Sequence, residues 1–387
     1  MTGKGLSAGR VLCVVGTRPE AIKMAPVIRG LRELDTGIKV GLALTGQHDE
    51  LVAEVLDVFG LRPEFDLAIM TQGQSPGEVG ALCLARLGPV FEAWRPGLVL
   101  VEGDTATVFF GALAAYHHRI AVGHVEAGLR TGNLRSPFPE EGYRRMAAVI
   151  ADLHFAPTAG ARKNLLREGI DDGRIHVTGN PVVDALLQVA EEMEVPKSLS
   201  VPHLCRDGAP PFALLTAHRR ESFGPPLERV FAALLELLDR HRTLEIVYPV
   251  HPNPSVEAPA RRILAGHPRV HLLDPLGYTE LVWMLAHATL VLTDSGGIQE
   301  EAPTFGTPVL VLREVTERPE GVDAGLAELV GTEAGKIVRA ALGLLERPRE
   351  ARQKALARNP YGDGRAGRRI AEIVGAFLGS ARAGQGR

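Results

Sequence analysis

The sequence predicts an α/β protein made of two parallel-sheet domains in tandem. Its 387 residues exceed the length at which a single hydrophobic core usually stops growing, which favours two domains. Short apolar runs alternate with longer amphipathic segments, and this alternation is typical of parallel sheets whose strands are joined by helices. The alternation occurs as two successive series, so we expect one doubly wound sheet in each half of the chain.

Each predicted strand is followed by a helix-like or loop segment. The first series consists of VLCVV (11–15), VGLALT (40–45), GLVLVEG (97–103), AVGHV (121–125), HFAPT (154–158) and IHVTG (175–179). The second series consists of FALLTAH (212–218), LEIVYPVH (244–251), VHLLD (270–274), TLVLTD (289–294) and PVLVL (308–312). Residues 191–212 lie between the two series and are rich in proline, serine and charge without a sustained period, so we interpret them as the connector.

Composition and charge are those of an ordinary soluble globular protein, with 45% hydrophobic and 23% charged residues. The formal net charge of -3 gives no general reason to expect nucleic acid or an anionic membrane as a partner. Cys13, Cys83 and Cys205 fit neither a disulfide framework nor zinc-site spacing, which favours a reducing cytoplasm. The N-terminus lacks the features of a signal peptide, and no apolar run reaches the roughly 20 residues of a membrane helix.

Ligands of doubly wound sheets bind beyond the carboxyl ends of the strands, so the residues after each predicted strand are the site candidates. GTRPE (16–20) follows the first strand and places Pro19 in the first turn of a helix. Arg18 and Lys23 lie where the N-terminus of that helix already favours an anion, so we interpret them as phosphate or carboxylate contacts. The alternative is an ordinary turn with solvated cations.

A comparable turn in the second half runs from Thr293 to Gly297. Its glycines allow the backbone to approach a diphosphate, and Glu300 or Glu301 one turn later suits the two hydroxyls of a ribose. The alternative interpretation is a glycine-rich turn with surface acids.

His218 and His251 each follow a predicted strand of the second series, so we expect their imidazoles near one crevice. They are interpreted as either functional or structural histidines. We predict no metal site, because no HxxxH, HxH or cysteine-rich spacing accompanies them.

The segment 124–145, HVEAGLRTGNLRSPFPEEGYRR, combines many charged side chains with Gly128, Gly132, Pro137 and Pro139. It is too interrupted to form one helix. Its charges are either solvated on a surface loop or folded inward around a ligand that needs acids and cations together.

Many motifs together resemble those of the non-hydrolysing UDP-N-acetylglucosamine 2-epimerases. They are GTRPEAIKMAPVI, TGQH, EGDT, VGHVEAGLRTGN, SPFPEE, HFAPT, NLLREG, TAHRRESFG, VYPVHPNP, LTDSGGIQEEAP and VTERPEG, from residue 11 to about residue 370. The resemblance implies a GT-B-type architecture, with two Rossmann-like domains facing a central cleft. We expect an N-terminal domain with the sugar-side acids (1–185), a UDP-binding domain (186–365), and a C-terminal helix and tail (366–387) that return to the first domain. The resemblance further implies a cytoplasmic homodimer that acts on a UDP-sugar for cell-envelope polysaccharide and uses no cofactor.

The expected reaction inverts C2 of the sugar, and the chemistry of that carbon limits the mechanism. C2 is not next to a carbonyl, so inversion needs either transient oxidation by a nicotinamide or an elimination. Oxidation by a nicotinamide would need a dinucleotide site. GDGRAG (362–367) matches the dinucleotide fingerprint, but it does not follow a buried strand and so fails the context that the fingerprint requires. The lack of a fingerprint in that context disfavours oxidation. Elimination of UDP gives a 2-acetamidoglucal, and protonation from the other face with re-addition gives the manno epimer. This route needs a base and an acid at C2, partners for the diphosphate and a site closed to water.

The resemblance assigns roles to residues that match the family's motifs. The catalytic positions are Asp104, Glu126, Glu140, Arg144 and His218. The three acids are expected to share the proton transfers and the orientation of the sugar. His218 is expected to stabilise the leaving diphosphate, and Arg144 to position an acid. The residues implied for substrate binding are Arg18, Lys23, Asp104, Glu126, His218, Leu276, Leu281, Ser295, Gly296, Gly297, Glu301 and Arg318.

Two residues beside these positions depart from the family's pattern. Glu102 stands where the family usually has the histidine of HGDT, and Tyr143 stands where it usually has an asparagine. Two alternatives compatible with Tyr143 stay open: a hydrolysing relative that releases UDP and N-acetylmannosamine, and an epimerase of a modified UDP-hexose. The non-enzyme alternative is a UDP-sugar binding protein without catalysis.

Overall fold

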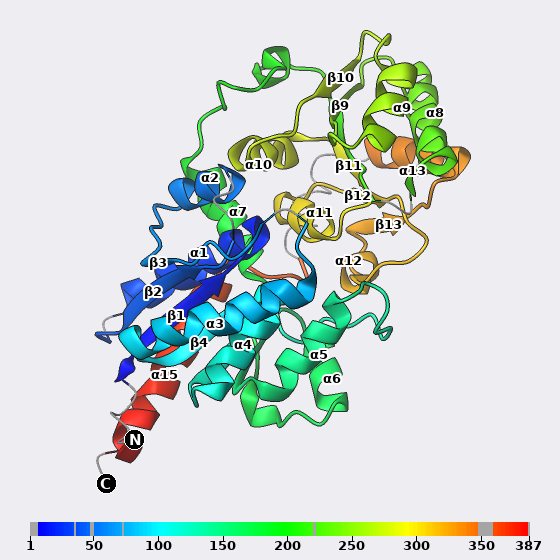
Figure 1. The fold of residues 1–387 in the computed structure, drawn as a ribbon. Coiled ribbons are helices and arrows are strands. Elements are labelled where there is room, and N and C mark those ends of the chain that lie inside the picture. Colours follow the sequence, from blue (N-terminus) through cyan, green and yellow to red (C-terminus); the bar gives the residue numbers. More distant parts are fainter. Residues whose placement is uncertain are drawn as a thin grey trace. The chain divides into compact units, whose positions relative to one another are not determined.

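The structure is a computed structural model of the chain, drawn in Figure 1. It describes residues 7–34, 36–46, 50–71, 73–219, 222–346 and 359–385. Gln47 and His48 of the TGQH motif, and Arg220 and Glu221 of TAHRRESFG, lie outside the described residues. The chain divides into two compact units: unit 1 comprises residues 1–185 and 361–387, and unit 2 comprises residues 186–360.

Unit 1 contains a parallel sheet in the order β3-β2-β1-β4-β5-β6-β7. The strands are β1 (Ser7–Val15), β2 (Lys39–Leu44), β3 (Phe65–Asp66), β4 (Pro96–Glu102), β5 (Ala121–Val125), β6 (Leu153–Ala156) and β7 (Ile175–Val177). The helices are α1 (Arg18–Glu33), α2 (Glu50–Val58), α3 (Pro76–Trp94), α4 (Ala106–His117), α5 (Glu140–Ile150), α6 (Ala159–Arg167), η1 (Asp172–Arg174) and α15 (Ala366–Gln385). Helix α7 (Pro181–Glu192) begins in unit 1 and continues into unit 2. The strand order reverses between β1 and β4, which is where a doubly wound sheet binds its ligand.

The last helix, α15, packs against α1 and β1 of unit 1, as its red ribbon beside the blue elements shows in Figure 1. Asp184 of α7 caps its N-terminus by accepting hydrogen bonds from the backbone N–H groups of Ala366 (3.1 Å) and Gly367 (2.8 Å). A Cβ atom at Gly367 would lie 2.6 Å from the carbonyl oxygen of Pro26 in α1, so glycine permits the close approach of α15 to α1.

Unit 2 contains a parallel sheet in the order β10-β9-β8-β11-β12-β13. The strands are β8 (Phe212–Thr216), β9 (Glu245–Pro249), β10 (Val270–Leu273), β11 (Leu290–Thr293), β12 (Val309–Val311) and β13 (Ala327–Leu329). The helices are η2 (Pro202–Cys205), α8 (Pro225–Arg240), α9 (Pro254–Leu264), α10 (Tyr278–His287), α11 (Gly296–Glu301), η4 (Ala302–Phe305), α12 (Pro319–Asp323) and α13 (Ala334–Leu345). Here the strand order reverses between β8 and β11.

Every strand that the sequence predicted is present, with ends shifted by a few residues. The sequence did not predict the edge strands β3 and β13, which have only two and three residues. Buried aliphatic side chains form cores in both units, including Leu12, Val14 and Val99 in unit 1 and Leu215, Ile246 and Leu292 in unit 2. The near-continuous apolar strands of the sequence are explained by this burial on both faces of each sheet.

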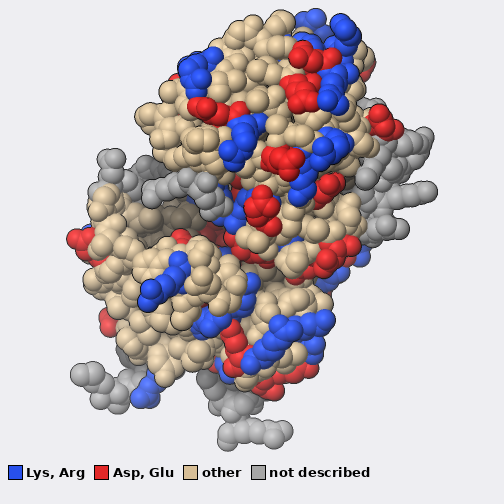
Figure 2. Space-filling model, turned by 90° about the vertical axis from the view of Figure 1, so that its right-hand side faces the viewer, with Lys and Arg blue, Asp and Glu red and all other residues tan. Residues whose placement is uncertain are grey.

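Figure 2 shows Lys and Arg side chains interspersed with Asp and Glu side chains on the face turned to the viewer. The protein also has paired charges on its surface, for example Arg261 with Glu257 and Arg262 with Glu228. Such exposed pairs contribute little to stability individually. Within the described ranges, the helices are all too short or too polar to traverse a bilayer.

Candidate active site

The turn between β1 and α1 is tightly packed. A Cβ atom at Gly16 would lie 2.2 Å from Oγ1 of Thr107 and 2.7 Å from Oγ1 of Thr45, so only glycine fits there. Arg18 follows in the first turn of α1, and its Nη2 atom is buried without a hydrogen-bond partner among the described residues. A buried cationic nitrogen of this kind is available to an anionic ligand.

Lys23, one turn further along α1, contacts two carboxylates. Its Nζ atom lies 3.1 Å from Oε1 of Glu102 and 2.5 Å from Oε1 of Glu126. Both acids are brought together by the sheet, because Glu102 pairs with Val125 in the register of β4 and β5 and Glu126 directly follows. Burial raises the pKa of Glu102 well above its ordinary value, while Lys23 opposes this rise.

Glu126 is held from several sides. Its side chain also accepts a hydrogen bond from Nδ2 of the buried Asn180 at 3.0 Å. Its backbone is in the left-handed region, with φ of 62°, which is uncommon for a residue other than glycine. Conformations of this kind cluster at functional sites, where the surrounding structure enforces them.

Arg144 of α5 forms the second cationic centre of unit 1. It forms an ion pair with Asp104, which lies in the loop after β4, and Nη1 lies 3.4 Å from Oε2 of Glu141. Glu141 is fully buried and also accepts hydrogen bonds from the backbone N–H groups of Thr131 (3.0 Å) and Gly132 (3.2 Å). The loop before α5 is therefore fastened to the same acid that contacts Arg144.

The segment 124–145 thus folds part of its charge inward. Glu126, Glu141 and Arg144 are buried, whereas Arg135 is exposed. Glu140 is half-buried, and its Oε2 atom has no hydrogen-bond partner among the described residues. An acid with an unpartnered buried oxygen is a candidate for contact with a substrate.

His124 supports the loop that carries Asp104. Its Nε2 atom lies 2.7 Å from the carbonyl oxygen of Gly103, so Nε2 is the protonated nitrogen that donates. Burial lowers the pKa of His124 to about 4, which keeps the ring neutral near pH 7. The sequence did not single out this histidine, because the interaction joins the end of β4 to the middle of β5.

The two departures from the family's pattern lie in different environments. Glu102 belongs to the acid group around Lys23. The ring of Tyr143 instead stacks on Phe109 of α4, with centroids 5.4 Å apart, and meets Phe110 edge-on at 5.8 Å. Tyr143 therefore packs α5 against α4.

In unit 2, His218 follows β8 and Asp294 follows the neighbouring β11. Asp294 is fully buried and accepts hydrogen bonds from the backbone N–H groups of His218 (3.0 Å) and Arg219 (2.9 Å). The rings of His218 and His251 stack with centroids 5.7 Å apart, so the prediction that they lie together is confirmed. Burial lowers the pKa of His218, and His251 and Arg219 act in the same direction.

The turn after β11 leads into α11. A Cβ atom at Gly296 would lie 2.7 Å from Nη1 of Arg318, so glycine leaves room for the guanidinium. Arg318 donates from Nε to Oε1 of the buried Glu300 at 2.5 Å. Ser295 donates its backbone N–H to Oγ1 of Thr293 at 2.9 Å. The turn formed by Ser295, Gly296 and Gly297 therefore lies beside the guanidinium of Arg318, which Glu300 holds in place.

The remaining predicted binding residues also belong to unit 2. Glu301 ends α11, and a Cβ atom at Gly297 would lie 3.1 Å from its Oε1. Leu276 and Leu281 are half-buried and pack against the core beneath α10. Sequence reasoning assigned no role to Glu20, Asn180 or Asp294, although each makes buried polar contacts beside a predicted residue.

A family profile described as UDP-N-acetylglucosamine 2-epimerase matches residues 32–375. The chain belongs to this family. It is similar to the UDP-N-acetylglucosamine 2-epimerase of Yersinia pestis, with 48% identity over 94% of this chain and 98% of that protein. It is 48% identical to the UDP-N-acetylglucosamine 2-epimerase of Bacillus subtilis, over 94% of each chain.

Solved members of the UDP-N-acetylglucosamine 2-epimerase family share the fold. The structure from Neisseria meningitidis bound to UDP-GlcNAc has a TM-score of 0.84 and 42% identity, over 94% of this chain and 99% of that chain. A lipopolysaccharide outer core galactosyltransferase shares the fold at 14% identity, with a TM-score of 0.56. These likenesses, with the two parallel sheets, confirm the predicted GT-B-type fold class of this epimerase-family chain.

Proposed function

We propose that the protein interconverts UDP-N-acetylglucosamine and UDP-N-acetylmannosamine by elimination and re-addition of UDP. The observation that carries the proposal is the arrangement of charge in unit 1, where Lys23 and Arg144 each contact two carboxylates. Inversion at C2 needs both a proton acceptor and a proton donor, and a group of acids held by cations provides both. Family membership and a relative bound to UDP-GlcNAc support the choice of substrate.

The proposed elimination begins with removal of the C2 proton by a carboxylate of unit 1. The electron pair of the C–H bond forms the C1–C2 double bond, the bond from C1 to the phosphate oxygen breaks, and UDP leaves as an anion. We assign the proton transfers and sugar orientation to Asp104, Glu126 and Glu140. The ion pair with Arg144 fixes the position of the Asp104 carboxylate in the loop after β4.

Re-addition reverses these bond changes, except that the proton reaches C2 from the opposite face. A protonated acid donates to C2, and the diphosphate oxygen of UDP attacks C1. Burial raises the pKa of Glu102 well above its ordinary value, so this departure from the family adds a fourth acid beside the three, one whose protonated form is favoured. Lys23 contacts both Glu102 and Glu126, which supports a role in balancing their negative charge. This role is in addition to the contact with UDP that we expect for Lys23.

We assign nucleotide binding mainly to unit 2. The diphosphate is assigned to the turn of Ser295, Gly296 and Gly297 and to the guanidinium of Arg318. The ribose is assigned to Glu301. His218 is positioned through the backbone hydrogen bonds to Asp294 and is proposed to stabilise the departing phosphate. Arg18 is assigned to the diphosphate, and the backbone near Leu276 and Leu281 to the uracil. Assembly as a homodimer stays a prediction.

Proton NMR of UDP-N-acetylglucosamine incubated with the protein in deuterium oxide tests the proposal. We expect UDP-N-acetylmannosamine to accumulate with deuterium at C2, because the proton is exchanged during elimination. Release of free UDP and N-acetylmannosamine would identify a hydrolysing enzyme. An unchanged spectrum despite tight UDP binding would contradict catalysis on this sugar.

Two variants separate catalysis from binding. Asp104→Asn and Glu126→Gln should each lower kcat by at least about a hundredfold, because each removes a proton-transfer group, while UDP affinity changes little. Asp172→Asn is the matched control, since Asp172 is an exposed acid of unit 1 that pairs with Arg162. Full activity of both site variants would refute the assignment.

A further inference from the structure

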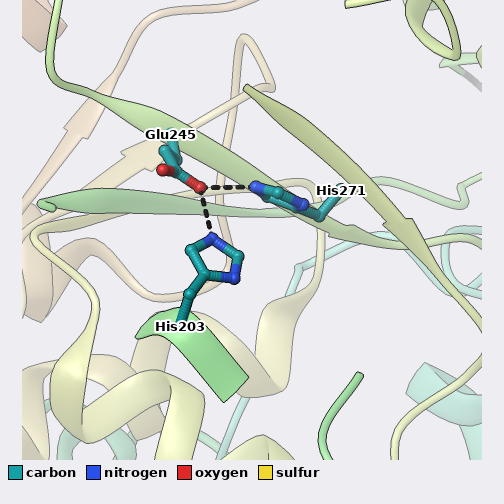
Figure 3. Close-up of side chains that lie close together, drawn as sticks. All are labelled: His203, Glu245 and His271. Carbon is teal, nitrogen blue, oxygen red and sulfur yellow. Dashed lines mark hydrogen bonds and ion pairs between the residues drawn. The ribbon is translucent and has the colours of Figure 1, made fainter. Parts of the chain in front are cut away.

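Three metal-ligating side chains converge in unit 2 away from the residues discussed so far. Figure 3 shows the rings of His203 and His271 pointing toward the carboxylate of Glu245. The Nε2 atoms of both rings approach the same oxygen, Oε2, at 2.8 Å for His203 and 2.5 Å for His271. The two ring centroids are 4.9 Å apart.

Three separate segments supply these residues. His203 lies in η2 of the connector, Glu245 is the first residue of β9, and His271 is the second residue of β10. Strands β9 and β10 are neighbours in the sheet, which fixes Glu245 and His271 at the same edge. The cluster therefore joins a segment that precedes β8 to the two outer strands on the far side of β8.

The donor set and its spacing suit a zinc ion. Imidazole nitrogen and carboxylate oxygen are both preferred by Zn²⁺, and the three candidate ligand atoms all lie within 4.8 Å of one another. A tetrahedral Zn²⁺ holds its ligand atoms about 3.3 Å apart, because its bonds are about 2.0–2.2 Å long. Adjustments on the order of 1 Å at the side-chain tips would bring the three atoms to that spacing.

The environment leaves one side of the cluster open. The side chains of Glu245 and His271 are 14% and 21% exposed, whereas that of His203 is 41% exposed. Two ligands are thus anchored on the sheet, and the third can turn toward an incoming ion. The exposed side gives room for a water molecule as a fourth ligand.

We propose that His203, Glu245 and His271 form a Zn²⁺ site that cross-links the connector to β9 and β10. Glu245 and His271 lie at the amino ends of β9 and β10, whereas His218 and Asp294 follow the carboxyl ends of β8 and β11. The ion is therefore assigned to fastening the connector and takes no part in the chemistry proposed for the sugar. The inference does not depend on the proposed function.

Titration of the full-length, tag-free protein with Zn²⁺ after removal of metals by a chelator tests the site. We expect calorimetry to give one equivalent bound per chain and thermal unfolding to show a Tm raised by several degrees, because the ion binds the folded state alone. His203→Ala should lower the affinity at least about tenfold and abolish the rise in Tm. Because the side chain of His203 is partly exposed, we expect this variant to fold, and circular dichroism checks that it does.

His267→Ala is the matched control, because His267 is a histidine of unit 2 that lies only four residues from His271 but outside the cluster. Its affinity for Zn²⁺ should equal that of the wild type. Binding of Co²⁺ gives a second readout, since three ligands and water should produce the visible absorption of a tetrahedral ion, and Glu245→Gln should remove it. Failure of the wild type to bind one equivalent, or equal binding by wild type and His203→Ala, would overturn the proposal.

Discussion

Replacing Glu20 by glutamine should remove a pH-dependent cost of folding. Glu20 is 2% exposed, and its Oε2 atom accepts a hydrogen bond from the backbone N–H of Gly16 at 2.6 Å. Its Oε1 atom accepts from the hydroxyls of Thr17 (3.0 Å) and Thr105 (2.7 Å). Burial raises the pKa of Glu20 from its ordinary value of 4.5 to about 7, although these hydrogen bonds oppose the rise.

Glutamine reproduces the protonated form of this acid. When Glu20 is protonated, Oε1 can donate to the hydroxyl of Thr17 or Thr105 while Oε2 still accepts from Gly16. The amide of glutamine can place its NH₂ at the first position and its oxygen at the second, so the same contacts are kept. The variant therefore differs from the wild type chiefly in lacking the ionisation.

The magnitude follows from proton linkage. The free energy of unfolding rises with pH where the unfolded chain binds more protons than the folded one. Between pH 4.5 and pH 7 the folded wild type retains the proton on Glu20 that the unfolded chain has lost, so its free energy of unfolding falls as the pH rises. A pKa difference of about 2.5 corresponds to about 3 kcal/mol, and more than half of this develops above about pH 5.5.

Urea unfolding of the wild type and Glu20→Gln at several pH values from about 5 to 8.5 measures this difference. We expect the variant to gain stability relative to the wild type as the pH rises and the gain to level off above the raised pKa. Histidines of the unfolded chain also titrate in this range, but both proteins share them, so the difference isolates Glu20. A difference that stays constant with pH would refute the raised pKa, and one of opposite slope would refute the sign.

Three further predictions concern packing, acid stability and catalysis. His154 is fully buried, and burial lowers its pKa to about 3. The unfolded chain therefore binds a proton at this histidine below about pH 6.5 while the folded protein does not, so the free energy of unfolding falls as the pH drops. His154→Leu should lessen this loss at pH 5 by about 2 kcal/mol, measured by urea unfolding. Gly80→Ala would place a Cβ atom 2.4 Å from the ring of Phe110 and should cost about 1–3 kcal/mol, whereas Gly343→Ala, on the open face of α13, should add about 0.5–1 kcal/mol. Thermal unfolding that ranks these two variants in the opposite order would contradict the packing argument. Glu102→Gln removes a proposed proton carrier and should lower kcat at least about tenfold at unchanged UDP affinity; an unchanged kcat would exclude that role.

The fold was predictable from the sequence because the strands are buried on both faces and read as continuous apolar runs. The run VLCVV became the core of β1, and TLVLTD became β11. Strands β3 and β13 could not be found this way, because two or three residues form no recognisable pattern. Their assignment depends on pairing with β2 and β12, which only the folded sheet provides.

The site was predictable only in part. Residues after strand ends could be identified, since parallel strands bring their carboxyl ends to one edge of a sheet, and His218 beside His251 illustrates this. Partners from distant segments could not be identified, such as Asn180 for Glu126, 54 positions apart. The same limit applies to His203 and Glu245, 42 positions apart, because no short spacing marks them as a possible metal site.

Glu102 shows why a departure from a family's pattern need not remove its chemistry. With one lysine facing Glu102 and Glu126, the group has one positive charge for two carboxylates, and burial penalises the surplus negative charge. The raised pKa of Glu102 is the consequence, because a proton relieves that penalty. The proposed reaction needs an acid that can donate a proton to C2. Under that proposal, the carboxyl of Glu102, whose protonated form is favoured, would take the place of the histidine that the family usually has there.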